Sequence, residues 1–237
     1  MSAVHALRVF AREPNLISQE LACDLECIAE SHLSCNDSEL ACCSHIAAAE
    51  QALQRHFPDF GKQLTYRMRP LRDQWEVRGP GLLKAVATQV FGAASVDTTQ
   101  LSSIQIELVH PLVGGDAYVC NETSIVMEAV LANPFPKIPE VGRLAWCIAQ
   151  IMVRRAIETE GVCSDVSVEL LALAPCLAAA QHVELLEFSS ATVGQAAAVW
   201  RVDHKSESFA EQLHKWWQSV SRDNVRWTEK LSKWPLT

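Results

Sequence analysis

The chain has 237 residues, of which 49% are apolar and 20% are charged, and its formal net charge is −8. This composition supports a folded core, argues against general disorder, and disfavours nucleic-acid binding, which needs a basic surface. No apolar run approaches the roughly 20 residues that span a bilayer. Because the first residues also lack the apolar stretch of a secretory signal, we expect a cytoplasmic protein with no membrane partner.

The nine cysteines form an odd number without the spacing of a disulfide framework, so we expect reduced thiols. Seven potential metal ligands lie within 23 residues: Cys23, Cys27, His32, Cys35, Cys42, Cys43 and His45. They fall in predicted helices and lack the paired Cys knuckles that usually hold zinc. We therefore predict buried apolar thiols, no metal and no cofactor, with a thiol or metal sensor as an alternative.

The N-terminal segment 14–58 predicts a helical hairpin. Asn15 can cap a first helix, and Asn36 with Glu39 forms a capping box for a second helix that ends near Phe57–Pro58. This hairpin is a possible subunit within one domain that covers residues 1–237.

A short strand is predicted for residues 62–69, where apolar and polar side chains alternate. Gly79-Pro80-Gly81 then predicts a tight turn that opens a new helix. Residues 62–84 carry six bases and two acids. They could hold an anionic ligand or the acidic N-terminal hairpin, or form ordinary solvated faces.

Two further strands are predicted near 104–110 and 117–131, joined by a Gly114-Gly115 turn. An almost wholly apolar helix follows near 139–156, and such a helix is usually buried. The expected fold is α+β: helix-dominated, with a small mixed or antiparallel sheet packed against this helix.

Only helices are expected after Gly161: about 165–174, 175–187 with Pro175 opening it, and 190–201. Ser206 to Val220 predicts another helix, whose apolar stripe packs on the body of the domain. The tail beyond it carries Trp227 and Trp234. We predict that it folds back, because an exposed tryptophan-rich tail invites aggregation.

Six polar residues are candidates for ligand binding: Arg78, His110, Asn121, Glu122, Glu128 and Arg143. His110 ends a predicted strand just before a turn, where sites are often placed, and Asn121 and Glu122 follow nearby. Glu128 interrupts an apolar run, so it needs a partner such as one of the two arginines. No residue has a catalytic motif around it, so none is assigned a catalytic role.

Two resemblances add to this interpretation. The order strand, Gly-Gly turn, strand, Pro-rich loop and apolar helix resembles the core of zincin-type metallopeptidases. The corresponding helix reads Arg143-Leu144-Ala145-Trp146-Cys147-Ile148-Ala149-Gln150 and lacks the HExxH motif, so this resemblance implies a scaffold without metal chemistry. The string Trp75 to Leu83, with Arg143 to Trp146, is similar to segments of uncharacterised planctomycete proteins, which imply no particular activity.

The sequence therefore favours a non-catalytic cytosolic protein that binds a small molecule or another protein, with its oligomeric state left open. One alternative is a hydrolase with a site at the strand ends around His110 and Glu128. The other is the sensor built on the N-terminal cysteines.

Overall fold

The computed structural model describes residues 48–49, 51–52, 54–92, 104–110, 117–133, 135–161, 166–204, 206–221 and 227–235. The chain divides into two compact units. Unit 1 comprises Met1–Arg67 with His110–Gly115, and unit 2 comprises Met68–Val109 with Asp116–Thr237. The 14–58 hairpin falls mostly outside the described residues. Those between 48 and 56 are helical, and the helix ends before Phe57, as predicted.

Helix α4, Phe60–Phe91, begins in unit 1 and continues into unit 2. The predicted strand at 62–69 is therefore wrong, because this segment is helical. Its alternation has no sheet to face: Leu64 and Met68 are half-buried and the Tyr66 side chain is 62% exposed. Leu64 and Met68 are four positions apart and so also share one face of a helix, which continues without a break into residues 70–91.

The predicted turn at Gly79-Pro80-Gly81 is also wrong, because all three residues lie inside α4. A Cβ on Gly79 would come within 2.6 Å of the Trp75 ring. The glycine therefore makes room for the indole that lies over it, rather than providing a turn. Pro80 is accommodated within the helix although it cannot donate a backbone hydrogen bond.

Three strands form one mixed sheet: β1 (Gln105–Val109), β2 (Ala117–Asn121) and β3 (Ser124–Glu128). Their order is β1-β3-β2, with β3 parallel to β1 and antiparallel to β2. The single strand predicted near 117–131 is instead a hairpin. Asn121 Oδ1 accepts a hydrogen bond from the Thr123 backbone N–H at 2.8 Å and so shapes its turn. The Gly114-Gly115 turn lies outside the described residues.

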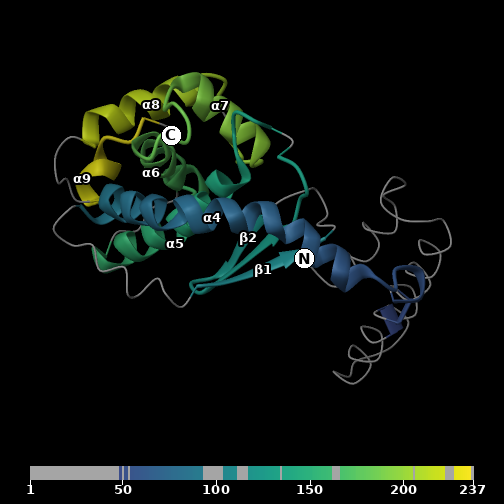
Figure 1. Cartoon of the computed structure of the whole chain (residues 1–237). Coiled ribbons are helices and arrows are strands. Elements are labelled where there is room, and N and C mark those ends of the chain that lie inside the picture. The colour runs from purple at the N-terminus through teal and green to yellow at the C-terminus, as the bar shows by residue number, and fades with distance from the viewer. Residues whose placement is uncertain are drawn as a thin grey trace. The chain divides into compact units, whose positions relative to one another are not determined.

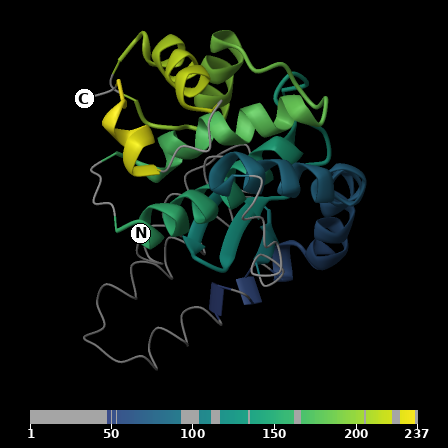
Figure 2. The ribbon, with the colours of Figure 1, turned by 90° about the vertical axis from the view of Figure 1, so that its left-hand side faces the viewer.

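Helix α5, Glu140–Thr159, confirms the predicted buried helix. Pro139 stands one position earlier than expected, as the residue before the first turn. Ile125 and Met127 of β3 are fully buried, as are Val141 and Ile148 on α5. Figures 1 and 2 show α5 between the sheet and α6, which explains why it is apolar nearly all round. Gly161, at φ +65°, follows its end as predicted.

Helix α6, Val168–His182, runs straight through Pro175, so the two helices predicted there are one. Pro175 is buried, and the close packing of α6 on α5 compensates for its missing backbone donor. Helix α7, Ser190–Val199, matches its prediction and is capped by the Ser189 hydroxyl. Trp200, just after α7, stacks on Trp146 of α5 with ring centroids 5.4 Å apart.

Helix α8, Phe209–Val220, starts three residues later than Ser206 but buries the predicted stripe. The described part of the tail folds back as helix α9, Trp227–Ser232. Trp227 is 1% exposed, and the ring of Trp234 meets that of Trp216 edge to face at 4.6 Å. Within the described ranges, no helix has both the length and the apolar content needed to cross a membrane.

Candidate functional site

The end of α4 is fastened to α9 by side chains from the tail. The Trp227 indole N–H donates to the Val90 carbonyl at 3.0 Å, and Lys230 Nζ donates to the Gln89 carbonyl at 3.4 Å. Both carbonyls belong to the last turn of α4, where the helix itself supplies no donor. The tail therefore fixes the position of Gln89, although the two are far apart in the sequence.

A carboxylate from the end of α5 holds α9 in turn. The two Glu160 oxygens accept from the backbone N–H groups of Trp227 and Thr228 at 3.0 and 2.9 Å. These are the first two residues of α9, where an acceptor and a negative charge are both favourable. Glu160 thus acts as a helix cap supplied from elsewhere in the chain.

Lys230 is buried between two indole rings. Its Nζ lies 5.1 Å from the Trp217 ring centroid and 4.8 Å from that of Trp227, both within cation–π range. Burial lowers the pKa of Lys230 from 10.5 to about 8, and the nearby Glu160 carboxylate opposes this shift. Lys230 as a whole is 4% exposed and is thus part of the core.

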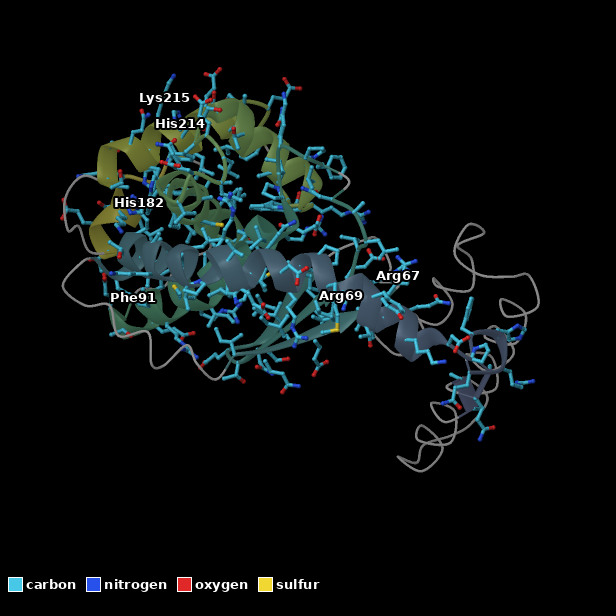
Figure 3. All side chains as sticks on the ribbon, in the orientation of Figure 1. Arg67, Arg69, Phe91, His182, His214 and Lys215 are labelled. Carbon is cyan, nitrogen blue, oxygen red and sulfur yellow. The ribbon has the colours of Figure 1, made fainter. Side chains whose placement is uncertain are left out.

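A cavity of about 570 Å³ opens beside this region of unit 2, and we call it the helix-end cavity. Its lining comes from the last turns or C-caps of three helices: Gln89 of α4, His182 of α6, and Gln218 with Ser221 of α8. In Figure 3, the labelled His182, His214 and Phe91 lie on the same side of unit 2. The volume falls within the range of small-molecule sites in proteins.

Most of the lining side chains are polar, and one of them is a carboxylate. The polar set is Gln89, Gln181, His182, Glu184, Gln218 and Ser221. Gln181 is partly committed, because its Oε1 accepts from the Phe188 backbone N–H at 2.8 Å and holds the loop after α6. Gln218 lies 3.3 Å from a His214 ring nitrogen. The Gln89 amide, together with the Gln181 Nε2 and Gln218 Oε1 atoms, can form hydrogen bonds with a ligand.

Two aromatic side chains, Phe188 and Trp217, complete the cavity wall. Phe188 is half-buried and meets the His214 ring edge to face at 4.8 Å. Trp217 is 1% exposed, and its indole N–H has no hydrogen-bond partner among the described residues. The cavity therefore combines two aromatic rings with a mostly polar lining, which suits recognition of a ligand by hydrogen bonds.

Glu184 occupies an unusual backbone position at the cavity. Its φ is +56°, the left-handed conformation that glycine adopts most readily. It follows α6 in a Schellman motif: its N–H donates to the Gln181 carbonyl at 3.0 Å, and that of Leu185 donates to the Ala180 carbonyl at 2.9 Å. The turn therefore fixes the place from which the Glu184 carboxylate projects.

A smaller cavity of about 320 Å³ shares Gln89 and His182 with the helix-end cavity. Its remaining lining includes Lys84 and Thr88 of α4 and Val183. Arg78 Nη1 donates to the Val183 carbonyl at 3.4 Å. The two cavities therefore adjoin at Gln89 and His182.

The six residues predicted from the sequence do not line the helix-end cavity, as far as the described residues show. Asn121 shapes the β2–β3 turn, and the backbone carbonyl of Glu122 accepts from Arg155 Nη2 at 3.0 Å. Arg143 is buried on α5 and pairs with Glu140 of the same helix at 3.3 Å. Of the six, Arg78 comes nearest to the cavities, through its bond to Val183.

Glu128 is the last residue of β3 and is half-buried. Val109 is its register partner on β1, and His110 follows directly. His110 is half-buried and belongs to unit 1, whereas Glu128 belongs to unit 2. The hydrolase hypothesis at these strand ends therefore stays a prediction, as does the single-domain organisation.

The cavity residues were missed for a physical reason. Gln89, Gln181 and Gln218 each stand in the last turn of a helix, a position that sequence can suggest. That the three helix ends meet depends on tertiary packing, which periodicity does not reveal. Glu184 gave no signal either, since it lies inside the helix predicted for 175–187 and only the structure shows its left-handed conformation.

The cysteines within the described ranges are Cys120, which is exposed, and Cys147 and Cys176, which are buried; none of the three forms a disulfide. Those ranges contain no group of three or more potential ligands that could hold a metal ion. The cysteine and histidine cluster at 23–45 lies outside the described residues, so the sensor hypothesis stays a prediction. No known protein family, curated protein or solved structure matches the chain, and both resemblances likewise stay untested.

Proposed function

We propose that this protein is a cytosolic binding protein that holds a small polar molecule in the helix-end cavity without transforming it. The observation that supports this most directly is the lining, in which three glutamine amides and a serine hydroxyl surround an aromatic wall. Amides do not titrate, so they suit recognition by hydrogen bonds better than proton transfer.

The cavity also lies between elements that are held firmly in place, which favours binding. The residues that line it stand at the ends of packed helices, and α9 fastens one of those ends through Trp227 and Lys230. A site held by rigid elements is preorganised, so less of the binding free energy is lost in ordering the side chains of the site.

A thermal-shift screen of small polar compounds tests the proposal. A ligand at about 100 times its Kd stabilises the folded protein by about 2.7 kcal/mol, which raises the melting temperature of a chain this size by several degrees. We expect Gln218→Ala to abolish most of the shift. Gln195→Ala, an exposed glutamine on α7, is the matched control and should keep it.

The proposal fails if no compound stabilises the protein, or if every compound that does so acts equally well on the Gln218→Ala variant. Separate measurement of the unliganded variants excludes a loss of folding. Gln218 is exposed on α8, so its replacement by alanine should leave the melting temperature without ligand almost unchanged.

A further inference from the structure

The helix-end cavity has a directional electrostatic feature. Helices α4, α6 and α8 all reach it with their C-terminal ends, through Gln89, His182 and Ser221. The aligned peptide dipoles of a helix place about half a negative charge at that end. Three such ends at one cavity add partial negative charge to its wall, and Lys230, which donates to the Gln89 carbonyl, offsets part of that charge at the α4 end.

The formal charge in the lining has the same sign. Glu184 is an exposed carboxylate, and the left-handed turn after α6 holds its backbone in place. Among the lining residues that the structure describes, His182 is the other side chain with a titratable group. The cation Lys84 belongs to the lining of the smaller, adjoining cavity.

The protein already places an ammonium group against the same structure. Lys230 Nζ donates to the carbonyl of Gln89 and lies over the ring of Trp217, and both residues line the cavity. A last-turn carbonyl and an indole face are both favourable partners for a cation. Phe188 adds apolar wall for the body of a ligand.

We infer that the helix-end cavity binds a small organic cation, an ammonium group carried on an apolar or aromatic body. This inference rests on the proposed binding function and names the ligand class for that site. The ammonium group lies toward Glu184 and the ends of α6 and α8, because Lys230 already occupies the α4 end. The apolar body lies against Phe188, since Trp217 is 1% exposed. The glutamine amides accept the remaining N–H groups of the ligand.

Two matched sets of probes test the inference by calorimetric titration of the full chain. The first set is benzylammonium, benzyl alcohol and benzoate, and the second is cyclohexylammonium, cyclohexanol and cyclohexanecarboxylate. Within each set the body is nearly constant and the charge changes. We expect the ammonium member to bind roughly tenfold tighter than the alcohol, and the carboxylate to bind weakest.

Two variants locate the cation. Glu184→Gln keeps the size of the side chain and removes its charge, so it should weaken ammonium binding about fivefold and leave alcohol binding unchanged. Glu187→Gln is the matched control, because Glu187 is exposed three residues later in the same loop and does not line the cavity. It should leave both affinities unchanged.

The outcomes separate the two proposals. The cation inference is overturned if the alcohols or carboxylates bind as tightly as the ammonium ions. If Gln218→Ala still abolishes their binding, the proposed binding site stands. Equal effects of Glu184→Gln and Glu187→Gln also overturn it. Failure of all six probes overturns the cation inference, and the proposed function then depends on the broader compound screen.

Discussion

Replacement of Lys230 by methionine should change how the stability of the protein depends on pH. Lys230 is 4% exposed, and burial lowers its pKa from 10.5 to about 8. Between these two values the unfolded chain binds more protons than the folded chain, so the free energy of unfolding rises with pH. Below about pH 8 both states are protonated, and Lys230 adds no pH dependence.

The size of the effect follows from the two pKa values. Raising the pH from 7 to 9.5 should stabilise the wild type by about 2 kcal/mol relative to Lys230→Met, since each pKa unit corresponds to about 1.4 kcal/mol. Other groups titrate in this range too, but they are common to both proteins and cancel in the difference.

Urea denaturation of both proteins at several pH values, followed by tryptophan fluorescence, measures that difference. Lys233→Met is the matched control, since Lys233 follows α9, pairs with Glu229 at 3.3 Å, and is largely exposed. It should show the pH dependence of the wild type. A difference between wild type and Lys230→Met that stays constant from pH 7 to 9.5 would refute the reasoning.

Four shorter predictions follow from the same region and from the cysteines. Truncation after Val220 removes α9 and should lower the melting temperature by several degrees, whereas an unchanged value with a changed oligomeric mass would mean that the tail serves association. Glu160→Gln weakens the cap of α9 and should cost about 1 kcal/mol in urea denaturation; no loss would show that the cap is unimportant. Glu184→Gly should stabilise the protein by about 0.5–1 kcal/mol by relieving the left-handed conformation, while reducing ammonium binding. Burial raises the pKa of the Cys176 thiol far above its usual value, so peptide mapping after brief alkylation at pH 8 should find Cys120 modified and Cys176 intact; equal modification would contradict its burial.

The elements predicted well from the sequence are helices that bury either one face or nearly their whole surface. The run from Val141 to Val153 is apolar on nearly every side, and it forms α5, which packs between a sheet and another helix. The stripe of Phe209, Leu213, Trp216 and Val220 is one face of a helix, and it is buried on α8. In both cases the hydrophobic pattern reflects the free energy gained on folding.

The wrong predictions concern prolines, a glycine and a short alternation. Pro80 and Pro175 were expected to open helices, yet both lie inside longer ones. At the buried Pro175, the packing of α6 on α5 offsets the lost backbone bond, which is a tertiary effect that local rules do not include. Gly79 was predicted to form a turn, whereas its missing side chain leaves space for the Trp75 ring. The helix-end cavity could not be predicted at all, since it depends on where three helices end in space.

The fastening of α4 by the tail has a consequence for the order of folding. Gln89 is synthesised early and Lys230 late, so the hydrogen bond from Lys230 to the Gln89 carbonyl can form only after nearly all of unit 2 has been made. Contacts between such distant positions form slowly, because a long loop must close first. We therefore expect the helix-end cavity to be among the last parts of unit 2 to assemble. A nascent chain should then be unable to bind the proposed ligand before α9 has been synthesised.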